Sequence, residues 1–214
     1  MVRRIAPLAL FCLLLAACAA RGPAPAAPRL EPVADVETFP QTAWAFVRQA
    51  DAPLLGPARQ ETRFAEFRAR WFAPWKRTAP SHRAEDVFWG FSAFAGKAWG
   101  QDLRPRPAAW LEALSRNTRR EEYPNLSRPA MALRRLDLRV LPEAGPVFRD
   151  PAAQGEGFPF DMNQNSSVLA GTPLFASHVT EDGAWLLVEG PFAAGFVPAR
   201  DVAFVSPAFA QRWQ

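Results

Sequence analysis

The feature that most constrains the fold is a change in the spacing of apolar residues near position 130. Before it, aromatic residues recur at intervals of three and four, as in Phe64, Phe67 and Trp71. After it, apolar and polar residues alternate over short runs. Spacings of three and four place side chains on one face of a helix, whereas alternation places them on one face of a strand. The sequence therefore predicts an α+β fold, with a helical segment over 38–129 followed by a small SH3-like β-barrel over 130–206.

The helical segment contains three apolar stripes, each of which predicts a helix. Their members are Phe64, Phe67, Trp71, Phe72 and Trp75, then Phe88, Phe91, Ala95 and Trp99, then Trp110, Leu111 and Leu114. Ser81 can cap the second helix, Pro107 suits the first position of the third, and a shorter helix is expected around Trp44 and Val47. Such stripes usually form a core, although they can also line a ligand groove.

The β-domain is expected to contain five short strands. They cover 133–140, 172–180, 184–189, 195–198 and 202–205. Glu181, Asp182 and Gly183 form a hairpin signal between the second and third strands. Five short strands with tight turns are typical of a small closed barrel. The insert over 148–168 then occupies the place of the large recognition loop, and residues 207–214 form a tail or a truncated linker.

The first residues have the pattern of a bacterial lipoprotein. Arg3 and Arg4 precede an apolar run that is too short to span a bilayer, which needs roughly 20 residues, so a signal peptide is expected over 1–17. Residues 15–18, Leu-Ala-Ala-Cys, match the lipobox, and Cys18 is the expected lipidation site. Acyl chains there would anchor the protein, because each buried methylene contributes about 0.8 kcal/mol. A plain secretion signal is the alternative.

The residues after the lipobox predict how the protein is held. Residues 18–37 are rich in Ala and Pro and are expected to form an extended tether. Ala19 stands where an aspartate would retain a lipoprotein in the inner membrane of many bacteria. The expected location is therefore the periplasmic face of the outer membrane, with a lipid anchor.

The overall charge argues against a nucleic-acid partner. The formal net charge is +4. Without Arg3 and Arg4, 23 basic residues remain against 21 acidic ones, and they are spread along the chain rather than clustered. No nucleic acid is expected among the partners.

The sequence shows no recognisable catalytic or metal site. Both cysteines, Cys12 and Cys18, lie in the export segment, so neither a disulfide nor a cysteine nucleophile is expected beyond it. His82 and His178 are too few for a metal site, and no cofactor is expected. Ser81 beside His82 gives poor geometry for a hydrolytic triad. His178 is expected to be structural, with a polar contact to a ligand as the alternative.

Several short segments carry a family resemblance. Those at 138–142, 171–174, 182–185 and 195–198 (Leu-Arg-Val-Leu-Pro, Gly-Thr-Pro-Leu, Asp-Gly-Ala-Trp and Gly-Phe-Val-Pro) follow the bacterial SH3 domain in order and spacing. The insert, with Gly-Glu-Gly-Phe-Pro-Phe-Asp at 155–161, resembles the first SH3-like domain of NlpC-type cell-wall peptidases. Upstream, 71–75 and 122–125 resemble the helical stabilising segment that precedes that domain. The resemblance covers roughly residues 40–206, and Phe196 replaces the Trp of many bacterial SH3 domains.

The resemblance implies the non-catalytic part of a cell-wall endopeptidase. In that family a second SH3-like domain and a papain-like domain with a Cys thiolate and a His base follow, and the sequence lacks that catalytic constellation. The chain is therefore not expected to be an enzyme by itself.

Three hypotheses follow from the resemblance. The first is a lipoprotein whose SH3-like module binds peptidoglycan stem peptides or a cell-wall peptidase. The second is the amino-terminal part of an endopeptidase whose catalytic domain is missing or separately encoded. The third is a structural lipoprotein whose barrel only packs.

The insert and its surroundings supply the expected ligand site. A peptide with a free amine needs a carboxylate and hydrogen-bonding groups beside an aromatic wall. The resemblance points the same way, because the first SH3-like domain of such peptidases borders the substrate groove. The expected ligand-binding residues are Glu156, Phe160, Asp161, Asn165, Ser166 and Trp185. The alternative is that the insert only folds against the helical segment or against a missing domain, with Asp161 and Asn165 as turn formers.

Overall fold

The structure, a computed structural model, describes residue 36 and residues 38–153 and 157–214. Cys18 and Glu156 lie outside the described residues, as do the expected signal peptide and almost all of the expected tether. The chain divides into two units, 1–54 and 55–214. In the described part of the first unit, the helix expected around Trp44 is a single 3-10 turn, η1 (Ala43–Phe46), capped by Thr42.

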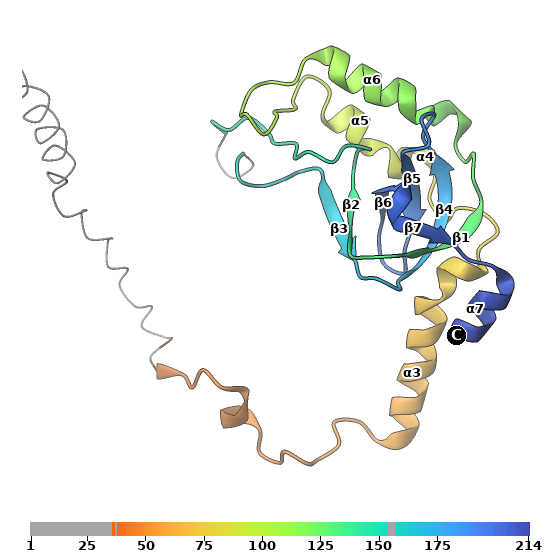
Figure 1. The fold of residues 1–214 in the computed structure, drawn as a ribbon. Coiled ribbons are helices and arrows are strands. Elements are labelled where there is room, and N and C mark those ends of the chain that lie inside the picture. Colours follow the sequence, from red (N-terminus) through yellow and green to blue (C-terminus); the bar gives the residue numbers. More distant parts are fainter. Residues whose placement is uncertain (1–35, 37, 154–156) are drawn as a thin grey trace, which may run out of the picture. The chain divides into compact units, whose positions relative to one another are not determined.

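The second unit begins with a series of short helices (Figure 1). They are α3 (Pro57–Trp71), η2 (Ala73–Lys76), α4 (Ala84–Val87), α5 (Trp89–Ala93), α6 (Ala108–Thr118) and η3 (Arg120–Glu122). The second expected helix is divided into α4 and α5, and Pro107 is the N-cap of α6. The expected cap at Ser81 is wrong, because Arg83 holds that position and its backbone N–H donates to Asp86. Within the described ranges, no helix has the length and apolar character to cross a membrane.

A seven-stranded antiparallel sheet follows. Its strands are β1 (Arg128–Ala132), β2 (Leu136–Arg139), β3 (Gln164–Val168), β4 (Pro173–Val179), β5 (Trp185–Glu189), β6 (Ala194–Pro198) and β7 (Val202–Phe204), with η4 (Ala199–Asp201) between the last two. The order is β3-β2-β6-β5-β4-β1-β7. The first expected strand corresponds to β2, β1 lies before it and was not expected, and β3 lies inside the expected insert. Because β3 and β7 are the two edges, closure into a barrel is not confirmed.

The inner face of the sheet packs aliphatic side chains against one another. This inner core consists of Ala130, Ala132, Leu136, Leu138, Val168, Leu174, Ala176, Leu186, Val188 and Val197. Every member lies on a strand of the sheet, so the alternation that predicted strands also produced this core.

The outer face of the same sheet packs against the helices. This outer core consists of Val87, Phe88, Phe91, Phe94, Ala98, Val140, Leu141, Val147, Leu187 and Phe196. Gly90 allows the approach, because a Cβ added there would lie 2.3 Å from Cγ1 of Val140. The second aromatic stripe is therefore core at Phe88 and Phe91, as the sequence predicts, and α6 adds Trp110, Leu111 and Leu114 at its edge.

Two buried polar residues also join the sheet to the helical segment. Glu189, 1% exposed, accepts hydrogen bonds from Arg77 Nη1 at 2.6 Å and from Ser81 Oγ at 2.5 Å. His178 is fully buried, and its Nε2 lies 2.5 Å from the backbone oxygen of Thr118. A buried polar group without a partner is costly, so these contacts fix where the helical segment sits on the sheet.

The first stripe behaves differently from the other two. It is helical as predicted, but α3 contributes no buried residue, and Phe64 and Phe67 are 58% and 55% exposed. The expectation that these two rings lie in the core is therefore wrong. The expected tail forms a last helix, α7 (Pro207–Trp213), in which Phe209 packs edge-on against Trp75. Figure 1 shows α7 beside the carboxyl end of α3, where Arg68 donates to the backbone oxygen of Gln214.

Candidate functional site

The insert is organised around the buried guanidinium of Arg139. A bulge between Leu138 and Arg139 interrupts the pairing of β2 with β3, and Arg139 is only 6% exposed. Its Nη1 donates to Asp161 at 2.8 Å and to Gln164 at 2.7 Å. Its other N–H groups donate to the backbone oxygens of residues 143–145. A buried guanidinium requires such complete pairing, so Arg139 fixes both ends of the insert together.

Asp161 and Asn163 complete this anchor. The second carboxylate oxygen of Asp161 accepts from the backbone N–H groups of Val147 and Asn163. The buried Asn163 side chain accepts from the N–H of Leu141 at 2.7 Å and donates to a backbone oxygen at 2.9 Å. Both oxygens of Asp161 are thus engaged inside the insert. The sequence analysis gave such a turn-forming role as the alternative for Asp161. Ligand binding by Asp161 stays a prediction.

The first part of the insert is held by the helical segment. Trp99 and Phe148 exchange backbone hydrogen bonds of 2.9 and 3.0 Å, and Phe158 packs edge-on against Phe148. This part folds against the helices, which is the alternative that the sequence offered.

The other expected ligand residues do not form one cluster. Phe160 is 60% exposed. Asn165 lies on β3 and donates to the backbone oxygen of Ala194 at 2.9 Å, and Ser166 is its neighbour on the same strand. Trp185 lies at the start of β5, half-buried at the edge of the outer core. Two separate hollows result, one beside Asn165 and one beside Trp185.

The Trp185 hollow has a volume of about 250 Å³ and mixed polar walls. It is lined by Arg134, Arg135, Leu136, Asp137, Arg139, Ala144, Trp185, Pro198 and Asp201. Arg134 lies 3.7 Å from Asp201. Among the residues that the structure describes, Arg135 and Asp137 have no ion-pair partner. The hollow therefore offers one free cation and one free anion beside an indole ring.

The Asn165 hollow is smaller, about 130 Å³, and lies between α4 and the sheet. Its ionisable lining residues are His82, Asp86 and Arg139. The backbone N–H of Arg83 donates to Asp86 and holds the pKa of that carboxyl below its ordinary value. Because Asp86 already caps α4, it has less capacity for a ligand than Asp137 has.

The histidines and Ser81 have structural partners. A carbonyl oxygen only accepts, so the contact with Thr118 places the proton of His178 on Nε2. The buried Nδ1 has no partner within the described part of the chain. Burial lowers the pKa of His178 and outweighs the opposing hydrogen bond to Thr118. The Ser81 hydroxyl donates to Glu189 rather than to His82. In the described ranges, no group of three or more His, Cys, Asp or Glu side chains is placed to hold a metal ion.

Sequence reasoning missed the charged residues of the Trp185 hollow. Arg135, just before β2, and Asp137 and Arg139 on β2 alternate with buried leucines, so the signal was present as polar residues at every second position. The pairing of β2 with β6 and of β6 with β5 then brings this face towards Trp185.

Comparisons with known proteins agree with this architecture. The model of the N-terminal NLPC_P60 stabilising domain matches residues 8–123, just over half of the chain. The model of an SH3 domain of the SH3b1 type matches residues 146–198. No curated protein matches the chain.

A solved structure has the same fold. An NlpC/P60 endopeptidase from Photobacterium damselae subsp. piscicida superposes with a TM-score of 0.74 at 20% sequence identity, over 82% of this chain and 43% of that one. This chain thus spans less than half the length of that endopeptidase. By the match over residues 8–123, the chain belongs to the family defined by the NlpC/P60 N-terminal stabilising domain, here followed by an SH3 domain of the SH3b1 type.

Proposed function

We propose that the chain is a peptide-recognising module of bacterial cell-wall turnover, and that the Trp185 hollow binds the peptidoglycan stem peptide. The observation that carries the proposal is the coexistence of an unpaired cation, an unpaired anion and an indole ring in one hollow. A stem peptide carries amine and carboxylate groups on a short backbone. Asp137 would pair with the amine, Arg135 with a carboxylate, and Trp185 would cover the backbone and donate its indole N–H.

The size of the hollow supports a short ligand. A volume of about 250 Å³ lies below the 300–1,000 Å³ range of drug-sized sites, so it suits one or two residues rather than a folded partner. Ala144 places the segment that leads into the insert in the wall, and a hydrogen bond from Arg139 holds that segment. A rigid wall reduces the ordering that binding requires.

A second candidate is supported by the structural comparison. The matched endopeptidase is more than twice as long as the part that this chain covers. The chain would then act as the amino-terminal part of an NlpC/P60-type endopeptidase and present the peptide to the catalytic domain. Under this candidate, the hollow binds stem peptide weakly until the catalytic domain is present.

Export and lipid attachment are also part of the proposal. The lipobox predicts acylation of Cys18, which would hold the module at the periplasmic face of the outer membrane. Labelling cells with a radioactive fatty acid tests this directly. The expected result is a labelled wild-type chain and an unlabelled Cys18→Ala chain. Equal labelling of both would contradict the anchor.

The binding proposal is tested by sedimentation with purified sacculi. The wild-type chain, produced from the residue after Cys18, is expected to pellet saturably. Asp137→Asn is expected to reduce pelleting about tenfold because a charge-assisted pair is lost. Trp185→Ala removes the wall and is expected to abolish pelleting. Trp213→Ala, which removes a half-exposed indole on α7, and Glu61→Gln, on α3, are the matched controls.

The outcome separates the candidates. Pelleting that falls for Asp137→Asn and Trp185→Ala but not for the controls supports a self-sufficient module. Pelleting equal to that of an unrelated protein contradicts it and favours the second candidate, which then requires binding to appear on addition of a catalytic domain. Because Asp137 is exposed, its variant remains informative even if Trp185→Ala loses stability.

A further inference from the structure

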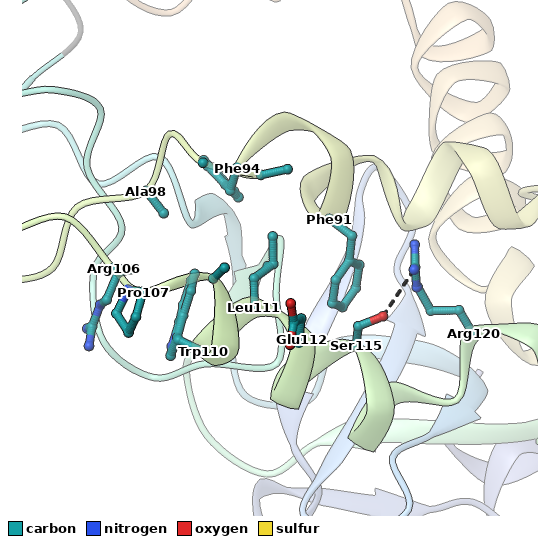
Figure 2. A pocket seen from close by; sticks show the side chains of 13 residues that line it. Phe91, Phe94, Ala98, Arg106, Pro107, Trp110, Leu111, Glu112, Ser115 and Arg120 are labelled. Atoms are coloured by element: carbon teal, nitrogen blue, oxygen red, sulfur yellow. Dashed lines mark hydrogen bonds between the residues drawn. The ribbon is translucent and has the colours of Figure 1, made fainter.

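A third cavity lies inside the helical segment, away from both hollows described above. It opens between α5 with the turn that follows it and α6, and has a volume of about 260 Å³. Figure 2 shows its walls, with Phe91 and Phe94 on one side and Trp110 and Leu111 on the other. We refer to it as the α5–α6 cleft. Its lining comes entirely from residues 91–120, so it belongs to the stabilising domain and not to the SH3 domain.

The two ends of the α5–α6 cleft are positively charged. Arg106 lies at one end and Arg120 at the other, as Figure 2 shows. The guanidinium of Arg106 lies 5.3 Å from the ring centre of Trp110, and that of Arg120 lies 4.6 Å from the ring centre of Phe91. Within the described residues neither arginine has a carboxylate partner. Arg120 also donates from Nη2 to the Ser115 hydroxyl at 3.0 Å. Both cations are therefore held beside aromatic rings without a carboxylate partner, and either can pair with an anion.

Arg106 shows a further sign of an incomplete site. Its Nε atom is buried and has no hydrogen-bond partner among the residues that the structure describes. It is held in place by close packing, since a Cβ added at Gly100 would lie 2.9 Å from that atom. Buried N–H donors are rarely left unpaired. An anionic group at this end of the cleft would therefore interact favourably with the guanidinium of Arg106.

The middle of the α5–α6 cleft favours apolar groups and disfavours anions. Its walls are apolar, and Glu112 lies on the α6 side between the two arginines. A carboxylate midway along the cleft would meet Glu112, whereas an apolar side chain would contact Phe91, Phe94 and Trp110. The cleft therefore has a cation at each end and an apolar middle with one carboxylate. A complementary ligand has an anion at each end and an apolar group between them.

The dimensions select a peptide as the occupant. With 11 residues, α6 is about 16 Å long at 1.5 Å per residue. An extended peptide advances about 3.3 Å per residue, so about five residues span the distance. The volume is too small for a folded element but suits the side chains of one or two large apolar residues.

We infer that the α5–α6 cleft binds an extended segment of a partner protein, with acidic residues at both ends and one or two large apolar residues between them. This inference concerns a second site on a different domain and does not rest on stem-peptide binding by the Trp185 hollow. It gives the stabilising domain a recognition role of its own.

The test uses fluorescence polarisation with the purified full-length chain. The probe is a labelled six-residue peptide with glutamate at both ends and leucine and phenylalanine in the middle. One comparison peptide has lysine at both ends, and another has serine in place of the two apolar residues. Tighter binding of the first peptide than of both others is expected. Equal binding of the three, or no binding of the first, overturns the inference.

Variants place the binding in the cleft. Arg120→Gln changes an exposed residue and is expected to weaken binding about five- to tenfold. Arg116→Gln removes a charge from α6, outside the cleft, and is expected to change binding less than about twofold. Ala108→Trp fills the cleft from α6 and is expected to abolish binding. Unchanged binding by both Arg120→Gln and Ala108→Trp, in variants with wild-type melting temperatures, overturns the inference.

Discussion

The two faces of the sheet are built from different kinds of side chain. The inner core contains only aliphatic residues, and all of them lie on strands of the sheet. The outer core contains four phenylalanine rings, three of which come from the helical segment. Buried ionisable residues are also found on the outer side, where Glu189 and His178 each bind the helical segment. The inner face is completed by the sheet itself, whereas the outer face needs the helices.

This difference bears on where the proposed peptide could bind. Because the helical segment covers the outer face through Phe88, Phe91 and Phe94, the centre of that face is closed to a peptide. The edge of the outer face remains open to solvent, and Trp185 lies there half-buried. The stabilising segment therefore determines which part of the SH3 domain faces solvent.

The largest expected effect comes from removing a ring shared by helix and sheet. Phe88 contacts Phe91, Tyr123, His178 and Phe196 with ring centres 5.3–6.3 Å apart. Phe88→Ala is expected to lower the free energy of unfolding by about 3–5 kcal/mol. Helix and sheet signals in urea unfolding should shift together. Phe64→Ala, on the exposed face of α3, should cost less than about 0.5 kcal/mol. A sheet that keeps its wild-type midpoint in Phe88→Ala would show that the two parts unfold separately.

A somewhat smaller loss is expected when Glu189 loses its cation. Arg77→Ala leaves a carboxylate that is 1% exposed without its charged partner, with only Ser81 to donate to it. Removing one member of a buried pair costs about 3–5 kcal/mol, and the partial exposure of Arg77 favours the lower end. The measurement is the urea midpoint at neutral pH, with Arg70→Ala on α3 as the control. A cost equal to that of Arg70→Ala would mean that this pair does not hold the helices to the sheet.

The buried histidine predicts a dependence on pH. Burial lowers the pKa of His178 below its ordinary value of 6.5, so the unfolded chain binds a proton at a higher pH than the folded chain does. Stability is therefore full above about pH 6.5 and falls as the pH decreases below it. From this one group, the free energy of unfolding can fall by at most about 1.4 kcal/mol per pH unit. Denaturant unfolding between pH 7 and 5 should show this slope for wild type and not for His178→Phe. The same slope in both chains would assign it to other groups.

The smallest effect is expected outside both cores. Ser206 caps α7 by accepting from the N–H of Phe209, and α7 has no buried residue. Ser206→Ala is expected to cost about 0.5–1 kcal/mol, because an N-cap hydrogen bond is lost. Amide exchange should become faster in α7 while β4 and β5 keep their protection. Faster exchange throughout the sheet would mean that α7 is part of the cooperative unit.

The sequence predicted the elements better than it predicted their contacts. The interval of three and four identified α3, α5 and α6, and alternation identified β4 to β7, because both patterns report which side chains share a face. The same interval could not distinguish Phe88 from Phe64. One is buried against the sheet and the other is exposed, and only tertiary packing separates them. β3 was missed because Gln164–Val168 is polar on both faces except at Val168.

Ligand binding by the residues expected from the sequence stays a prediction, but the structure shows how the described ones among them are placed. Trp185 was identified from its turn and its resemblance, and it does line a hollow. Asp161 was chosen as a free carboxylate, but the structure pairs it with Arg139 and two backbone N–H groups. Such pairing depends on a bulge in β2 and on the fold of the insert, neither of which a residue pattern reveals. The free carboxylate of the hollow is Asp137, on the strand before the insert.

The most direct test of the account is a chemical-shift titration of the ¹⁵N-labelled chain with a soluble peptidoglycan stem peptide. The account predicts that the indole N–H of Trp185 and the amides of Arg135 and Asp137 shift with one common affinity. It also predicts that the α5–α6 cleft and the Asn165 hollow stay unchanged. Shifts confined to the Asn165 hollow, or none that saturate, would contradict the assignment of peptide binding to the Trp185 hollow.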